Sequence, residues 1–260
     1  MDSKNSAWIN AMFLIVTLVI NALGGMGAIN GLSQGEVSNM FETLITPSPF
    51  TFSIWGLIYT LLIISIIVMI FKSDDSYYKN VIDRISVLFR ISCVLNMAWI
   101  VAFSYVLLEL SVLLILSLVV VLSLICKELL SVHESGQWLV PLTFGMYTGW
   151  LLIASVVNIA ATLVKIEWNG FGIPDEIWAA IILIAAVFIT ILVNSSLKNA
   201  VIPLPVAWAY FGIYQNLKSP TGFNGEYELL QIIALVEMVV FIVIAGIQFY
   251  KNHFALLPEK

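Results

Sequence analysis

Long apolar runs recur along this chain and constrain its fold more than any other feature. Each is about 20 residues long, which is the length of a helix that crosses a lipid bilayer. The seven clearest runs are residues 8–26, 50–71, 85–107, 111–130, 138–164, 177–197 and 229–250. Of all residues, 61% are hydrophobic and 10% are charged, whereas an ordinary soluble domain has about 25% charged residues. The sequence therefore predicts an all-α, polytopic membrane helix bundle.

An eighth apolar run, residues 201–217, is shorter than the others and begins with Pro203 and Pro205. Proline is tolerated in the first turn of a helix, because the missing N–H would have no partner there. We count this run as a transmembrane helix, which gives eight in total. The first run is too long for the core of a signal peptide, so we expect it to be retained as the first helix.

The distribution of lysine and arginine predicts how the bundle is oriented. With eight helices and the N-terminus inside, the inner loops hold most of the basic residues, and the outer loops hold only Lys165 and Lys218. Cytoplasmic loops of membrane proteins are enriched in Lys and Arg. We therefore expect a multi-pass protein of the cell membrane with both termini in the cytoplasm.

The composition also argues against several kinds of site. The few basic residues are scattered and form no basic stripe, so we expect no binding of nucleic acid. Cys93 and Cys126 lie in apolar runs without a histidine at metal-ligand spacing. We interpret both as helix-packing residues and expect neither a metal site nor a cofactor.

Three of the predicted helices each present large aromatic rings on one face, because residues three or four positions apart share a face. The residues grouped in this way in the second, third and fifth runs are Trp55, Tyr59, Asn96, Trp99, Phe103, Tyr147, Trp150 and Asn158. If these faces converge, they enclose an apolar cavity in which rings supply stacking area and asparagines orient a flat hydrophobic ligand. Alternatively, the rings anchor helices at the membrane interface, and the asparagines join helices.

The same residues carry a resemblance to the TspO/MBR family of tryptophan-rich sensory and translocator proteins. They lie within the strings FTFSIWGLIY, LNMAWIVAF and YTGWLLIASVVN, which follow the order of similar motifs on the second, third and fifth helices of that family. The glycine-rich end of the first run is also similar. The chain differs from the family where Leu44, Ile45 and Thr46 precede Pro47 in place of tryptophans, and where Met146 precedes the fifth-helix tyrosine in place of proline.

The resemblance extends from about Trp8 to Lys165. It implies a five-helix core in residues 1–166, to which residues 167–260 add a three-helix membrane segment. It also implies a tetrapyrrole such as a porphyrin as the ligand. From its own residues, the segment 30–49, which has no Lys or Arg, is expected to cover a ligand bound at the outer face. The expected partners are this porphyrin-like small molecule, the lipid bilayer and, as an open alternative, a second copy of the chain in a homodimer.

Glu237 is an acidic residue within the last apolar run, about eight residues from its outer end. An ionised carboxylate at such a depth costs at least about 2.5 kcal/mol on insertion scales. A carboxyl there can carry a coupling proton or bind a cation. It can equally be a neutral side chain that hydrogen-bonds to another helix.

The leading functional prediction is a membrane protein, not an enzyme, that binds a hydrophobic, porphyrin-like ligand for sensing or transport. The alternative is a proton-coupled secondary transporter that uses Glu237, with the proline-led run at 201–217 as the interrupted helix that such carriers favour. The sequence contains no metalloprotease, nucleophile-elbow or P-loop motif, so no catalytic residues are predicted.

Overall fold

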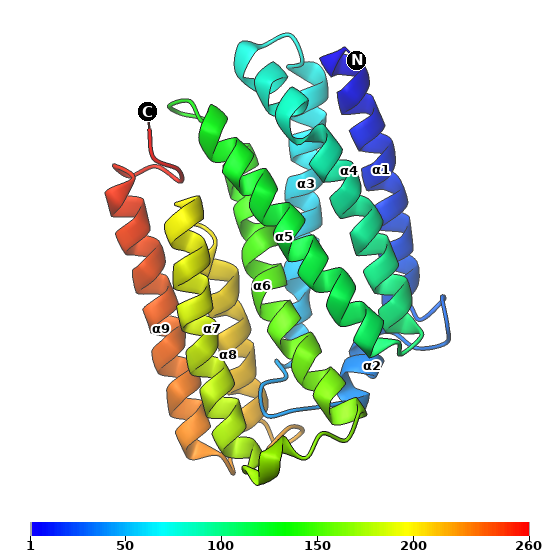
Figure 1. Cartoon of the computed structure of the whole chain (residues 1–260), viewed down its shortest axis with the longest axis vertical. Helices are drawn as coiled ribbons and strands as arrows, with labels where there is room; N and C mark the ends of the chain where they lie inside the picture. Colours follow the sequence, from blue (N-terminus) through cyan, green and yellow to red (C-terminus); the bar gives the residue numbers. More distant parts are fainter. Residues whose placement is uncertain (1, 260) are drawn as a thin grey trace.

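The computed structural model describes residues 2–259, and all of the regular secondary structure in this range is helical, as predicted (Figure 1). Short 3-10 turns, η1 (Pro49–Ser53) and η2 (Gly170–Gly172), precede α3 and α7. The α-helices are α1 (Ser3–Gly25), α2 (Gln34–Met40), α3 (Ile54–Phe71), α4 (Ser76–Ser104), α5 (Leu108–Val132), α6 (Leu139–Lys165), α7 (Asp175–Leu197), α8 (Pro203–Lys218) and α9 (Glu228–Lys251).

Seven helical segments within residues 2–259 are long and apolar enough to cross a membrane. They are α1, η1 with α3, α4, α5, α6, α7 and α9, and each overlaps one of the seven clearest apolar runs. The chain is therefore a multi-pass membrane protein. Helix α8 has 16 residues, or about 24 Å, which is shorter than the roughly 30 Å of a hydrocarbon core. The count of eight membrane spans stays a prediction.

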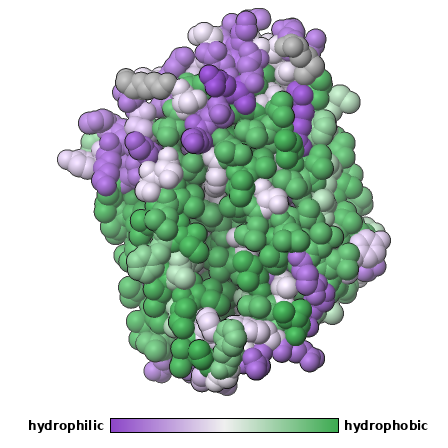
Figure 2. Space-filling view, in the orientation of Figure 1, coloured by the Kyte–Doolittle hydropathy of each residue, from purple (hydrophilic) through white to green (hydrophobic). Residues whose placement is uncertain are grey.

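The surface is polarised in the way that a lipid solvent requires. A broad apolar band covers the middle of the face in Figure 2, and hydrophilic residues gather towards its ends. Helix α1 shows the same division, since Met12 and Val16 are exposed while Asn10 and Asn21 are buried. Lipid offers no hydrogen bonds, so the polar side chains of a membrane helix turn towards its neighbours.

Helix α6 lies at the centre of the bundle. It packs against α3, α5, α7 and α8. In its most apolar stretch 67% of the residues are buried, whereas the buried share in the corresponding stretches of α7 and α9 is 28%. Gly149 allows the close approach of α8, because a side chain there would collide with the carbonyl of Ile202. Cys126 of α5 is buried against Phe144 and Thr148 of α6, in keeping with the predicted packing role.

The C-terminal helices share the buried apolar cluster of the first five long helices, which runs from Ala7 to Leu257. The connection from α7 to α8 is itself buried. Asn199 donates from Nδ2 to the carbonyl of Pro141 at 2.9 Å, and the Ala200 amide donates to the carbonyl of Leu256 at 3.0 Å. The division into residues 1–166 and 167–260 stays a prediction.

Helix α1 begins and α9 ends at one end of the bundle (Figure 1); we call the opposite end the distal end. The segment 26–53 lies there and is more structured than the covering loop that the sequence predicts. It contains α2, which starts with a capping box: Ser33 Oγ accepts from the Glu36 amide at 3.2 Å, and Glu36 Oε2 accepts from the Ser33 amide at 2.7 Å. Two side chains thus satisfy amides at the start of the helix.

Candidate functional site

A cavity of about 50 Å³ lies between α3, α4 and α6, towards the distal end. Five of the sequence-predicted residues line it: Trp55, Trp99, Phe103, Trp150 and Asn158. The remaining lining residues were not predicted from the sequence as site residues. They are Gln34, Ser38, Pro47, Phe52, Ile153, Ala154, Val157, Ala161 and Ala209. The three helix faces therefore meet around one cavity, which the segment 26–53 and α8 complete.

Trp55 is the central ring of an aromatic cluster. It stacks on Tyr59, with ring centroids 5.2 Å apart and an interplanar angle of 20°. Its centroid also lies 6.2 Å from Trp99, 5.9 Å from Tyr147 and 6.2 Å from Trp150. These separations are typical of favourable aromatic pairs. Trp55 thus joins rings from α3, α4 and α6.

A chain of hydrogen bonds lies beside this cluster. Tyr59 Oη donates to Oδ1 of Asn21 at 2.5 Å, Asn21 Nδ2 donates to Oδ1 of Asn96 at 2.6 Å, and Asn96 Nδ2 donates to Tyr147 Oη at 3.0 Å. Tyr59, Asn96 and Tyr147 do not line the cavity. They hold α1, α3, α4 and α6 together beside it.

Asn21 is the residue of this chain that sequence analysis missed. Its signal is a polar stripe on α1, because Asn10, Thr17 and Asn21 share one face of an otherwise apolar helix. All three are buried. A polar stripe of this kind predicts which face of a membrane helix meets its neighbours.

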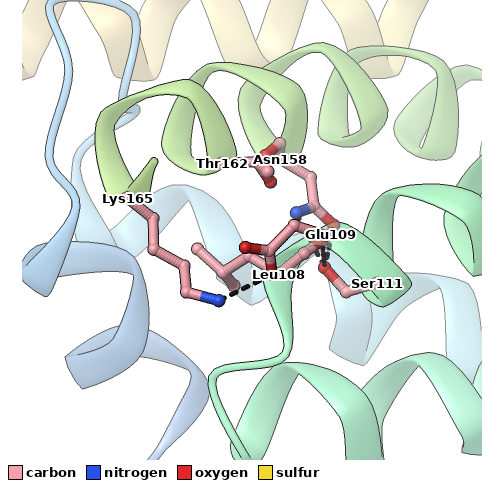
Figure 3. Close-up of polar contacts among 6 residues, drawn as sticks. All are labelled: Leu108, Glu109, Ser111, Asn158, Thr162 and Lys165. Atoms are coloured by element: carbon pink, nitrogen blue, oxygen red, sulfur yellow. Dashed lines mark hydrogen bonds and ion pairs between the residues drawn. The ribbon is translucent and has the colours of Figure 1, made fainter. Parts of the chain in front are cut away.

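A second polar group includes Asn158 of the cavity lining, which Figure 3 shows beside Ser111. Trp99 Nε1 donates to Oδ1 of Asn158 at 3.0 Å, and Asn158 Nδ2 donates to Ser111 Oγ at 2.9 Å. Nearby, Lys165 Nζ lies 2.6 Å from Oε2 of Glu109. These contacts connect α5 to α6 at the distal end. Ser111 could not be predicted as part of this group, because nothing in the sequence distinguishes it except its position after the third predicted helix.

Trp150 differs from Trp99 in its polar contacts. It is 2% exposed, and its Nε1 is buried without an acceptor in the described part of the chain. A buried donor without a partner costs about 1–3 kcal/mol. Trp150, a lining residue of the cavity, therefore carries a buried hydrogen-bond donor that is unused.

Helix α8 holds the segment that covers the cavity. Trp208 Nε1 donates to the carbonyl of Thr51 at 2.9 Å, and the Ser48 amide donates to the carbonyl of Gly212 at 3.0 Å. A side chain at Gly212 would collide with Thr51. The C-terminal part of the chain therefore contributes to the site through its contacts with the segment 26–53 and through Ala209.

Glu237 lies apart from the aromatic cluster, on α9, and does not line the cavity. It is 8% exposed, and its Oε2 has no hydrogen-bond partner within residues 2–259. The hydroxyl of Tyr210 on α8 faces it. That hydroxyl donates to the carbonyl of Leu183 at 2.7 Å. The structure thus places a buried, incompletely paired carboxyl between α8 and α9.

A family model described as TSPO-like protein matches residues 7–247 of the chain. The matched range continues beyond Lys165, where the sequence resemblance was expected to end, and it includes α7, α8 and most of α9. Neither the curated proteins nor the solved structures gave a match.

Proposed function

The chain belongs to the TSPO-like protein family, and on that premise we propose that it binds a flat hydrophobic ligand of the porphyrin class for sensing or transport. The observation that carries the proposal is the convergence of Trp55, Trp99, Phe103 and Trp150, with Asn158, on one cavity. Rings provide stacking area for a flat ligand, and a few polar groups orient it. Binding and release, with no catalytic residues, are the proposed activity.

The size of the cavity adds a condition to this proposal. It holds about 50 Å³, whereas ligand pockets usually hold about 300–1,000 Å³. A tetrapyrrole therefore needs the cavity to open. Gln34, Ser38, Pro47 and Phe52 form the part of the wall that belongs to no long α-helix. We infer that the segment 26–53 moves outwards when ligand binds, while the rings on α3, α4 and α6 stay in place.

The unpaired Nε1 of Trp150 supports a ligand with an acceptor at its edge. The carboxylates at the periphery of a porphyrin such as protoporphyrin are acceptors of this kind. A ligand that accepts from Trp150 removes the cost of the buried, unpaired donor. Binding would thus gain both from stacking and from this hydrogen bond.

The test is a titration of protoporphyrin into the purified protein, followed by quenching of tryptophan fluorescence. Trp99→Phe and Trp150→Phe should each weaken binding about twofold or more, because an aromatic contact contributes ~0.5–1.5 kcal/mol beyond its buried area. Asn96→Ala should weaken binding indirectly, because Asn96 does not line the cavity but holds Asn21 and Tyr147 in place beside it. Trp138→Phe is the matched control, since Trp138 is 58% exposed at the other end of α6. Equal affinity of all four variants for protoporphyrin would contradict the proposed binding site.

A second candidate function is proton-coupled transport through Glu237. The observation that favours it is the buried Oε2 without a partner, because an intramembrane carboxyl in such a position is suited to bind and release a proton. Glu237→Gln should abolish the uptake of the ligand into proteoliposomes that a pH gradient drives, and it should leave equilibrium ligand binding intact. Uptake that persists in this variant would contradict the transport role.

We also propose that α8 completes an eight-span topology with both termini in the cytoplasm. Helix α1 begins and α9 ends at the same end of the bundle (Figure 1), which requires α8 to return the chain between α7 and α9. Lys165 and Lys218 are the basic residues of the distal end within residues 2–259, and external loops are poor in such residues. Cysteines introduced as Asn224→Cys and Ser135→Cys should react with an impermeant maleimide from opposite sides. The homodimer stays a prediction.

A further inference from the structure

A second and larger cavity opens at the distal end, away from the Trp55 cluster. It holds about 230 Å³ and lies between α6, α7 and the connection from α8 to α9. We propose that it binds a small organic ammonium ion that carries an apolar group. The side chains that argue for this ligand are Trp168, Trp178, Phe223, Tyr227, Glu42 and Asp175.

The aromatic walls of this cavity are held in place by local structure. Trp168 and Trp178 have ring centroids 5.2 Å apart at 56°, and Trp178 Nε1 donates to the carbonyl of Gly170 at 2.8 Å. Gly170 has a φ of 60°, and a Cβ there would lie 3.1 Å from Trp178 Nε1. The turn therefore needs glycine to fix the indole. Indole rings are the best aromatic partners of an organic cation.

The other wall adds two more rings and the apolar surface that the rest of the ligand needs. Phe223 and Tyr227 have centroids 5.8 Å apart at 79°. Leu44, Ile45 and Ile182 complete an apolar lining. This lining and the volume of the cavity suit a small organic ion, which is held by rings and apolar groups. No group of three or more potential metal ligands occurs in residues 2–259, which favours an organic ion over a metal ion as the ligand.

The charged side chains that line the cavity are acidic. Glu42 and Asp175 line it, and no basic side chain does. Of the two distal lysines in residues 2–259, Lys165 pairs with Glu109, and Lys218 lies 5.6 Å from the ring centroid of Tyr214. Both are engaged away from the cavity.

The carboxylate of Glu42 is positioned rather than mobile. Asn216 Nδ2 donates to its Oε1 at 2.9 Å and to the carbonyl of Thr46 at 3.1 Å. Asp175 lies in the first turn of α7 together with Glu176. A helix N-terminus carries only about half a positive charge, so the two carboxylates that line the cavity, Glu42 and Asp175, more than offset it. The potential at the cavity is therefore negative.

The proposed site has a lining distinct from that of the porphyrin site, although the segment 26–53 contributes residues to both. Ala160 and Leu163 of α6 line the distal cavity, whereas Asn158 and Ala161 line the other. The two sites lie on different faces of α6, and their linings share no residue. A variant that no longer binds one ligand can therefore still bind the other.

The test is a calorimetric titration of benzyltrimethylammonium into the full-length protein in nanodiscs of zwitterionic lipid. Wild type should bind it saturably. The double variant Glu42→Gln/Asp175→Asn should bind at least about fivefold more weakly, because one carboxylate about 4 Å from a cation contributes that factor even in water. Glutamine at residue 42 keeps an acceptor for Asn216, so the loop should stay in place.

Glu176→Gln is the matched control, because it removes a neighbouring charge that does not line the cavity. It should bind the ammonium ion like wild type, and the double variant should bind porphyrin like wild type. Two results would overturn the proposal: no saturable binding by wild type, or equal affinity in wild type and the double variant. Failure of porphyrin binding alone would overturn only the function proposed above.

Discussion

Trp99 on α4 donates its indole hydrogen to Oδ1 of Asn158 on α6 at 3.0 Å. Asn158 donates in turn to Ser111 on α5 at 2.9 Å, so one amide joins three helices. The bilayer core contains no water that could replace these bonds. The orientation of the Trp99 ring at the cavity wall therefore depends on Asn158.

Replacing Asn158 with alanine should lower the free energy of unfolding by about 1–2 kcal/mol. A helix–helix hydrogen bond within a membrane contributes ~0.6 kcal/mol on average, and here two such bonds are lost and the Trp99 donor is left buried. The measurement is unfolding in mixed micelles. Ser117→Ala is the control, because that exposed hydroxyl bonds only to Leu113 of its own helix. Similar losses in the two variants would contradict the role of Asn158.

The bond between Tyr59 and Asn21 should show measurable coupling. Tyr59→Phe removes the donor and Asn21→Ala removes the acceptor of this 2.5 Å bond. A double-mutant cycle should give a coupling energy of about 0.6–1.7 kcal/mol, which lies between the average and the maximum for such bonds in membranes. Strictly additive effects would show that α1 and α3 are held together by packing alone.

Gly149→Ala should destabilise the bundle by about 1–3 kcal/mol, the usual cost of overpacking. The reason is the carbonyl of Ile202, which occupies the space of the added methyl group. Gly246→Ala on α9 is the matched control, since nothing lies within 4 Å of its Cβ position. The control should be neutral or slightly stabilising, because alanine favours a helix more than glycine does. Thermal unfolding of both variants in detergent makes the comparison.

Stability should fall on mild acidification because of His133, which follows α5 outside the membrane-spanning segments. Burial lowers its pKa below the usual 6.5, although Glu259 and Glu134 partly oppose this. The unfolded chain therefore binds the proton more readily than the folded protein. The stabilising contribution is fully present above pH 6.5 and is lost as the pH falls through the lower pKa of the folded state.

The measurement is the melting temperature of the wild type and of His133→Gln between about pH 7.5 and about pH 5, the range in which a histidine changes charge. The wild type should lose more thermal stability over this range than the variant does. Both ring nitrogens of His133 lack partners in the described residues, so no hydrogen bond offsets the burial of its charged form. Parallel pH profiles would assign the acid sensitivity to other groups.

Much of the aromatic part of the site was predictable from local spacing. Trp55, Trp99 and Trp150 each lie on a helix face with a second large or amide side chain, and these faces do converge. Spacing did not distinguish the residues that line the cavity from those that brace it. Tyr59, Asn96 and Tyr147 are bonded to one another through Asn21 beside the cavity, and no single helix carries that information.

The sequence by itself determined that this protein is a bundle of membrane helices and which helix faces carry rings and amides. The physical reason is that lipid leaves the backbone no hydrogen-bond partner outside its own helix, so apolar length and helical period are enough. Only the tertiary structure decided that α8 braces the segment 26–53 through Trp208 and Gly212, and that a second aromatic cavity forms beside Glu42 and Asp175. Thr51 and Trp208 are 157 positions apart, and contacts at such separations depend on the packing of whole helices, which no local pattern encodes.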